Sequence, residues 1–304
     1  MRLRWTFAGL VALACGLAWA QAPSPRPRIT GVSHLAVYTS DPAAAASFYA
    51  DQMGFAKLPD PESSQGVRYA LSPTQWVEVL PLPPNAGINR LDHIAFTTDS
   101  AEGMRKFLAA KAWKVPSSVQ KGSDGSQWFE VLDPEGNRVQ FIQPVLKPID
   151  APRAVGRHII HIGIVVHSRE AEDAFYRAIL GFRPYWFGGA AEGRIDWVSQ
   201  QTPDSRDWLE YMMVAPGPVT DITQQRLGVM NHLSVGEISV QQVAEKLLVP
   251  GVLTGRHDPA PKIGHDGKYQ LNLYDPDDTR LELMNFKPTQ PACCSPRTAP
   301  DPEP

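Results

Sequence analysis

The sequence contains an internal repeat, and this repeat restricts the possible folds more than any single motif does. The segment 158–182, HIIHIGIVVHSREAEDAFYRAILGF, is similar to the segment 34–55, HLAVYTSDPAAAASFYADQMGF. Aligning the Phe-Tyr pairs of the two segments gives a constant offset of 127 residues, which places His161 on His34. The chain is therefore expected to consist of two related halves.

Each copy of the repeat predicts a strand followed by a helix. Around His161 and Gly163, every second residue is apolar, as in a strand with one face on a core. The helix is expected to begin at Asp41 in the first copy and at Ser168 in the second, because both residue types cap helix N-termini. Glycines 54 and 181 are suited to end it.

The strand-helix pattern occurs twice in each half, which predicts four βαβββ units and an α+β fold. In the first half we expect strands at 34–39, 55–59, 67–72, 76–80, 92–96, 127–132 and 138–142, and helices at 42–53 and 102–111. In the second half we expect strands at 159–166, 183–187, 194–199, 208–214, 232–236, 269–274 and 280–285, and helices at 169–180 and 240–248.

The first residues have the order of a secretory signal. Two arginines precede an apolar run at 5–20, which ends in small residues before Gln21. The run is too short for a stable transmembrane helix. A lipoprotein cleavage site at 13–16 is the alternative, which we rank lower because Ala12 stands where such sites usually have leucine. Either way, we predict export to the periplasm or out of the cell.

Composition divides the rest of the chain. We predict a signal peptide at 1–20, a proline-rich leader at 21–29, a first domain at 30–146, a linker at 147–156, a second domain at 157–287 and a disordered tail at 288–304. Each domain is long enough to bury a core. The adjacent cysteines Cys293 and Cys294 are expected to be exposed thiols in this tail.

The charge of the chain argues against two classes of partner. The net charge is −3 and becomes more negative when the signal peptide is removed. Nucleic acids and anionic membranes are therefore not expected as partners. We expect a small-molecule substrate and no membrane span, and the sequence leaves the oligomeric state open.

Four positions recur at corresponding places in the two halves. They are His161, Glu210, His232 and Glu282 in the second half, and His34, Glu78, His93 and Gln140 in the first. Each lies in a predicted strand between apolar neighbours that face the other way, so the polar groups are expected to converge on one cavity. A lone strand histidine is usually a core residue, but a fourfold coincidence at duplicated positions is harder to explain in that way.

Two imidazoles and two carboxylates suit a first-row divalent metal that keeps open positions. We therefore predict a metal site in the second half. The first half is a weaker candidate, because neutral Gln140 stands in the place of a carboxylate. This donor set leaves the metal open among nickel, cobalt, zinc, manganese and iron.

These units resemble the vicinal oxygen chelate (VOC) superfamily, which includes glyoxalase I, bleomycin resistance proteins and extradiol dioxygenases. The likeness covers residues 30–286 and extends to the Asp-Pro turns at Asp133 and Asp275. It implies two tandem open-barrel domains, each built from two βαβββ units around a metal. The resemblance also places ligands on the first and last strands of each unit, which His161, Glu210, His232 and Glu282 match. Whether the units pair within or across the halves is open.

The resemblance implies a glyoxalase-like lyase or isomerase, in which Glu282 or Glu210 moves a substrate proton. The first alternative is an extradiol-type ring-cleaving dioxygenase with iron on His161, His232 and Glu282. Against it, Asn272 stands where such enzymes have a tyrosine. The second alternative is a non-catalytic small-molecule binding protein.

Five residues are candidates for substrate binding. His257 and His265 lie in a basic loop that can close over an anionic substrate, and Trp208 is two residues from Glu210 and is expected to face the same cavity. The other candidates are Asn272 and Tyr274.

Overall fold

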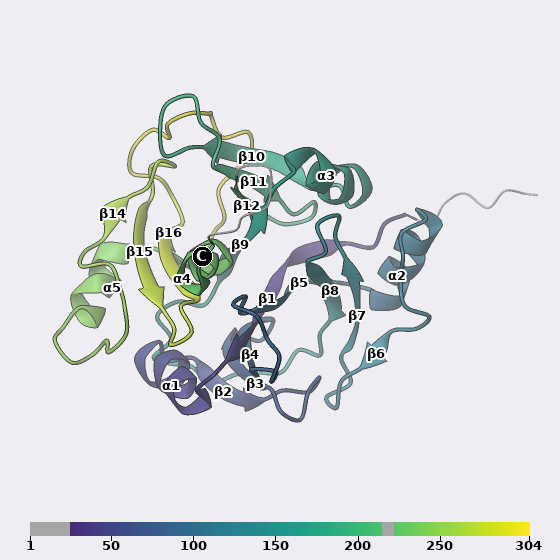
Figure 1. The fold of residues 1–304 in the computed structure, drawn as a ribbon, viewed down its shortest axis with the longest axis horizontal. Helices are drawn as coiled ribbons and strands as arrows, with labels where there is room; N and C mark the ends of the chain where they lie inside the picture. Colours follow the sequence, from purple (N-terminus) through teal and green to yellow (C-terminus); the bar gives the residue numbers. More distant parts are fainter. Residues whose placement is uncertain (1–24, 215–221) are drawn as a thin grey trace, which may run out of the picture.

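The computed structural model describes residues 25–214 and 222–304. The signal peptide predicted at 1–20 lies outside these residues, as do residues 21–24 of the leader predicted at 21–29. In the described part of the chain, each half forms one curled eight-stranded sheet. Figure 1 shows the first half in purple to blue and the second in teal to yellow, with β1 and β9 next to each other where the halves meet.

The strands agree with the predicted pattern, but their ends shift, most of all in the first strand, which begins at Ile29 rather than at residue 34. The first sheet contains β1 (Ile29–Thr39), β2 (Ala56–Pro59), β3 (Val67–Ser72), β4 (Gln75–Pro81), β5 (Leu91–Thr98), β6 (Gln120–Lys121), β7 (Gln127–Leu132) and β8 (Arg138–Gln143). The second contains β9 (Ile159–Val166), β10 (Arg183–Gly188), β11 (Trp197–Gln201), β12 (Trp208–Met213), β13 (His232–Glu237), β14 (Lys262–Ile263), β15 (Tyr269–Tyr274) and β16 (Arg280–Asn285). The two-residue strands β6 and β14 were not predicted, because they are too short to show a period.

The two units of each half pair with each other. The strand order is β2-β3-β4-β1-β5-β8-β7-β6 in the first sheet and β10-β11-β12-β9-β13-β16-β15-β14 in the second. The first strands of the two units run antiparallel at the centre of each sheet, and each also pairs in parallel with the last strand of its own unit. The question of pairing across the halves is thereby answered, and the fold is the predicted α+β tandem. The boundaries of the domains stay predictions.

The two helices of the repeat widen after their first turn. They consist of α1 (Pro42–Ala46) with the π-helical turn η1 (Ser47–Gln52), and α3 (Arg169–Asp173) with η2 (Ala174–Ile179). Asp41 and Ser168 cap them as predicted. The wider turn brings the adjacent Phe-Tyr pair of each helix into the core together, which a regular α-helix does less well.

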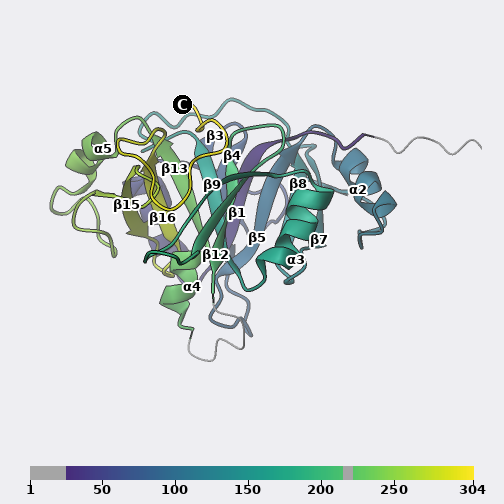
Figure 2. The ribbon, with the colours of Figure 1, turned by 90° about the horizontal axis from the view of Figure 1, so that it is seen from above.

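The remaining helices are α2 (Ala101–Ala110), α4 (Gln224–Met230) and α5 (Val240–Leu247). The sequence did not predict α4, which Thr223 caps. Figure 2 shows α5 and α2 at opposite ends of the molecule. Among the helices of the described residues, none has the length and apolar character that crossing a bilayer requires.

The Asp-Pro turns connect the two halves. Tyr49 donates a hydrogen bond to Asp275 Oδ2 at 2.9 Å, and Tyr176 donates to Asp133 Oδ2 at 3.2 Å. The acid two residues after each of these aspartates accepts backbone N–H groups from the strand-to-helix corner of the other half. The contacts are reciprocal, so the repeat also organises the junction.

The tail at 288–304 differs from its prediction as a disordered segment. The structure places it against the second sheet, where Asp301 forms an ion pair with buried Lys268 at 2.9 Å. The backbone N–H of Thr298 donates to the carbonyl of Tyr185. Cys293 and Cys294, predicted to be free thiols, form a disulfide with each other. The tail docks because Lys268 is buried and needs a counter-charge, which proline content alone did not reveal.

Candidate metal centre

Three buried side chains converge in the second half. His161 extends from β9, His232 from the start of β13 and Glu282 from β16. The two histidine Nε2 atoms are 3.0 Å apart, and His161 Nε2 is 3.3 Å from Glu282 Oε2. One donor atom from each residue lies within 4.8 Å of the other two. This spacing suits three ligands of one ion.

Glu210 on β12 lies beside this group of three donors. Its Oε2 is 3.6 Å from His232 Nε2, but it is not among the donors that all lie within 4.8 Å of one another. The four positions predicted from the sequence are thus brought to one place, with three close together and the fourth at their edge.

The sheet topology explains why four residues so far apart in sequence meet. The strands β12, β9, β13 and β16 are consecutive neighbours in the sheet, and each contributes one side chain to the same face. In the register, Glu210 pairs with Gly163, and His232 pairs with the same glycine from the other side.

Neighbouring groups hold the two imidazoles. The ring of Trp208 stacks on that of His161 with 4.5 Å between centroids. His232 Nδ1 lies 2.8 Å from the Met230 carbonyl, so in the neutral ring Nδ1 carries the proton and Nε2 presents a lone pair to the site. A Cβ on Gly163 would lie 2.0 Å from His232 Cε1, so this glycine makes room for the ring.

The protonation states fit a metal ligand set. Burial lowers the pKa of His161 and lowers that of His232 well below its usual value, which keeps both rings neutral. Burial alone would raise the pKa of Glu282, but the charge of Arg280 and the hydrogen bond with His161 outweigh it and lower this pKa to about 2. Two neutral imidazoles and an anionic carboxylate that converge on one point are the donor set that a divalent ion requires.

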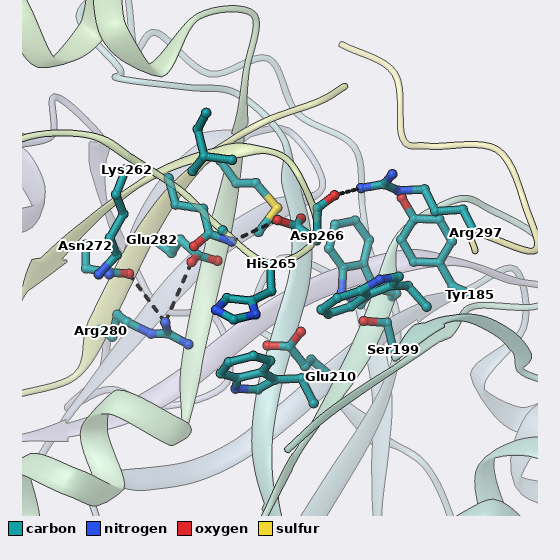
Figure 3. A pocket seen from close by; sticks show the side chains of 17 residues that line it. Tyr185, Ser199, Glu210, Lys262, His265, Asp266, Asn272, Arg280, Glu282 and Arg297 are labelled. Carbon is teal, nitrogen blue, oxygen red and sulfur yellow. Dashed lines mark hydrogen bonds and ion pairs between the residues drawn. The ribbon is translucent and has the colours of Figure 1, made fainter. Parts of the chain in front are cut away.

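The site opens into a cavity of about 350 Å³ (Figure 3). Glu210 and Glu282 line it, together with Trp208, Asn272 and His265 from the substrate-binding candidates. The other two candidates lie elsewhere. The guanidinium carbon of Arg256 lies 3.2 Å from the ring centroid of Tyr274, and His257 is exposed with Nδ1 bonded to the Asp258 carbonyl.

Sequence reasoning missed several residues that line the cavity, among them Arg280, Ser199 and Tyr185. Arg280 lies two residues before Glu282 on the same strand, so period-2 alternation was a sufficient signal for it. No comparable signal was available for Ser199 and Tyr185, because they come from β11 and β10, where no ligand was expected.

The first half contains a similar cluster. His34 Nε2 is 2.9 Å from His93 Nε2 and 3.5 Å from Glu78 Oε2, and all three residues are buried. Gln140 donates from its amide to Glu62 Oε2 at 2.7 Å. The four predicted positions again lie in one region, but the amide of Gln140 bonds to an acid that the sequence did not predict to take part.

Arg68 closes this cluster off. Its Nε donates to Asp60 at 3.1 Å, its Nη2 donates to Glu62, and its guanidinium carbon lies 4.0 Å from the ring centroid of Trp76. Arg68 pairs with Glu78 between β3 and β4, as Ser199 pairs with Glu210 between β11 and β12. A short serine leaves the second cavity open, whereas a buried arginine takes up the matching space in the first.

The surface hollow of the first half does not reach the histidine and glutamate cluster, as expected if Arg68 closes it off. It has a volume of about 330 Å³ and is lined by Arg68 and Trp76, but not by His34, Glu78 or His93. The cavity of the second half reaches two of its four candidate ligands.

Comparisons with known proteins agree with the fold. Residues 31–141 match the sequence model of the Glyoxalase/Bleomycin resistance protein/Dioxygenase superfamily. A comparison with curated protein sequences gave no match.

Solved structures with the same fold include enzymes of two kinds. A catechol 2,3-dioxygenase aligns with a TM-score of 0.64 and 16% identity, over 90% of this chain and 92% of its own. The Mn(II)-bound glyoxalase from Novosphingobium aromaticivorans aligns with a TM-score of 0.61 and 22% identity, over 85% and 83%. The homoprotocatechuate 2,3-dioxygenase from Arthrobacter globiformis aligns with a TM-score of 0.64 and 16% identity, over 86% and 81%.

At these identities the structural neighbours show the fold alone, and they align over both halves of the chain. The family match covers residues 31–141, and the second half repeats the strand order of the first. Residues 31–141 are thus similar to this superfamily in sequence, and the two halves of the chain together have the fold of these solved structures.

Proposed function

We propose that the second half is a metal-dependent active site of the glyoxalase-like kind, a lyase or isomerase acting on a small molecule with two neighbouring oxygen atoms. His161, His232 and Glu282 would hold a divalent ion, with Glu210 as the fourth ligand. The observation that carries the proposal is the second carboxylate, Glu210, at the edge of the three-residue group and facing the cavity.

The bound metal would supply Lewis-acid polarisation of the substrate oxygens. The chain's own residues do the rest. Glu282 remains the anionic ligand next to Arg280, and Glu210, which stands outside the close group, takes the proton from the carbon beside the polarised oxygen and returns it at the neighbouring position. Trp208 fixes the orientation of His161 by stacking on it.

The second candidate is a ring-cleaving dioxygenase. The close group of His161, His232 and Glu282 favours it, since two histidines and one carboxylate suffice for that chemistry. Asn272 argues against it, because it pairs with Glu282 across β15 and β16 at the place where the dioxygenase pattern has a tyrosine. Tyr269 and Tyr274, which could replace that tyrosine, do not line the cavity.

Anaerobic turnover separates these two functions. The metal-loaded protein is expected to convert hydroxycarbonyl substrates without oxygen. Manganese is the first metal to test, because the glyoxalase with the same fold is described as Mn(II)-bound. Oxygen uptake coupled to catechol cleavage with ferrous iron would select the dioxygenase. A protein without metal and without turnover would be a binding protein.

Variants test the ligand assignment. His161→Ala, His232→Ala and Glu282→Gln are each expected to reduce the metal content measured by mass spectrometry, because each removes or weakens one ligand. His34→Ala and His93→Ala are the matched controls in the first half and are expected to reduce the metal content less. Equal losses in both sets would contradict a single dominant site.

We also propose that the protein acts in the periplasm or outside the cell, on the strength of the charged, apolar and small-residue order at 1–20. The intact mass of the exported protein tests this. A chain that begins near Gln21 would support the proposal, and a chain that retains its first twenty residues would refute it.

A further inference from the structure

Arg280 is a partly buried cation at the edge of the cavity with few partners. Its side chain is 11% exposed, and its Nη1 lies 3.4 Å from Asn272 Oδ1 and 3.6 Å from Glu282 Oε1 (Figure 3). Its buried Nε has no hydrogen-bond partner among the described residues. A buried donor without a partner is costly, so this guanidinium is suited to receive a ligand.

The first half shows how such an arginine is satisfied when it has no ligand to bind. Arg138 occupies the position of Arg280, since Arg138 pairs with His93 and Arg280 pairs with His232 on the neighbouring parallel strand. Arg138 is bonded to the carboxylate of Asp92 and lies 3.5 Å from Glu130. Both of its acidic partners have neutral counterparts in the second half.

The counterparts are asparagines. Asn231 precedes His232 as Asp92 precedes His93, and Asn272 pairs with Glu282 as Glu130 pairs with Gln140. Asn231 uses its side chain elsewhere, accepting from Val165 N and donating to Asn89. The second half therefore retains the arginine but lacks the two carboxylates that would neutralise it.

Other cations of the cavity are already paired. Lys262 lies 3.1 Å from Asp258, and Arg297 lies 3.2 Å from Asp301 and donates to the Asp266 carbonyl. Of the three acids that line the cavity, Glu210 and Glu282 would be neutralised by the divalent ion, and Asp266 lies near the cations Lys268 and Arg297. Among the described cavity residues, Arg280 is thus the cation whose charge is available to bind an incoming anion.

Much of the remaining cavity lining is aromatic or apolar. Trp186, Trp197 and Trp208 line the cavity together with Tyr185 and Met284. Flat apolar ligands pack well against such aromatic surfaces. The cavity of about 350 Å³ therefore combines the guanidinium of Arg280, next to the proposed ligand Glu282, with aromatic side chains in its lining.

We propose that Arg280 binds the carboxylate of an aromatic 2-hydroxy or 2-oxo acid, with the ring against the tryptophans and the 2-oxygen toward the proposed metal ligands. The position of that oxygen rests on the proposed function, whereas the anion contact and the ring contact do not. Arg280 is then the residue that selects carboxylates over neutral substrates.

Calorimetric titration of the metal-loaded full chain with three ligands tests this. Mandelate carries the ring, the 2-hydroxyl and the carboxylate, 1-phenylethane-1,2-diol lacks the carboxylate, and lactate lacks the ring. Mandelate is expected to bind most tightly. Arg280→Gln should weaken mandelate by at least about tenfold, as expected for a lost charge-assisted hydrogen bond, and leave the diol unchanged. Lys262→Gln, which alters another cation of the same cavity, should leave mandelate binding unchanged.

Arg280→Lys provides a second variant, which keeps the charge but lacks the planar guanidinium. Its affinity for mandelate is expected to lie between those of the wild type and Arg280→Gln. Mandelate that does not bind, that binds no better than the diol, or that binds Arg280→Gln as tightly as the wild type would overturn the proposal. Metal content, measured on the same preparations, separates the proposed metal-dependent function from the proposed anion contact of Arg280. A metal-free protein that still needs Arg280 for mandelate would refute the proposed function and leave the anion site standing.

Discussion

At the scale of single residues, the geometry of the site depends on Gly163, which has no catalytic group. The Cβ of an alanine there would lie 2.0 Å from His232 Cε1 and would push the ring out of its place. Gly163→Ala is therefore expected to lower metal affinity by at least about tenfold, as changes that misorient a ligand typically do. Metal titration with a competing chelator measures this effect.

The first half offers the matched control. Ala36 pairs with His93 as Gly163 pairs with His232, so Ala36→Gly makes the reverse change at the equivalent position. It is expected to leave metal binding by the second half unchanged. Unaltered affinity in Gly163→Ala would mean that His232 moves without cost or is not a ligand.

A second difference of one residue separates the halves. Arg68 fills the space above the first-half cluster, and Ser199 leaves the matching space open. Arg68→Ser is expected to raise the metal content from about one ion per chain toward two, because it frees Glu78 and the two histidines for a cation. Mass spectrometry of the purified protein gives the count.

The reciprocal change, Ser199→Arg, should place a cation beside Glu210 and reduce metal binding and turnover in the second half. The two variants are therefore expected to change the metal content per chain in opposite directions. If Arg68→Ser still binds about one ion, the neutral Gln140 rather than the arginine would be what limits the first half.

At the scale of elements, the tail at 288–304 is expected to contribute to stability. Asp301 pairs with Lys268, whose side chain is only 1% exposed. Asp301→Asn would leave that ammonium without its closest anion. The cost is expected to be somewhat below the about 3–5 kcal/mol typical of breaking a buried pair, because Tyr185 still lies within hydrogen-bond distance of Lys268.

Urea unfolding measures this cost, and Glu303→Gln serves as its control. Glu303 also forms an ion pair from the tail, with Arg206, but its side chain is 67% exposed. Exposed pairs contribute about 0–1 kcal/mol, so this variant should unfold nearly as the wild type does. Equal, small effects of both substitutions would show that the tail is not docked in solution.

At the scale of the whole molecule, the junction between the halves contains a buried acid that has no counterpart. Glu172 accepts the backbone N–H of Glu135 at 3.2 Å, whereas the repeat places Ala45 at the equivalent position. Burial, together with Asp133 and Glu135, raises the pKa of Glu172 to about 9. The folded protein therefore keeps a proton that the unfolded chain loses at a much lower pH.

The sign of the pH effect follows from this difference. Between the ordinary pKa of 4.5 and about 9 the folded state binds more protons than the unfolded state, so the contribution of Glu172 to stability falls as the pH rises. Glu172→Gln keeps an acceptor oxygen for Glu135 and removes the ionisation. Its melting temperature relative to the wild type is expected to increase from about pH 5 to about pH 8.5.

Thermal unfolding across this range measures the difference. Glu170→Gln changes an exposed residue of the same helix, so it should leave the pH dependence of the melting temperature as in the wild type. A wild type and a Glu172→Gln variant whose curves stay parallel would contradict the raised pKa.

The sequence by itself determined much of the architecture and the candidate site. The repeat implied two related halves, and the period-2 alternation around His161 and Glu282 placed both side chains on the polar face of their strands. Asp41 and Ser168 marked the helix starts, since capping depends on neighbouring residues alone. These features are local or repeated, which is why the sequence reveals them.

Only the tertiary structure decided which units pair, which half is open and which charges are satisfied. Arg68 closes the first cluster because its partners Asp60 and Glu62 come from the chain before β3 and fold back over it. Arg280 remains available because two separate segments contribute asparagine where the first half has acids. The tail docks because a lysine in another element is buried. Each outcome depends on contacts between residues distant in sequence, whose combined charge and volume no local pattern encodes.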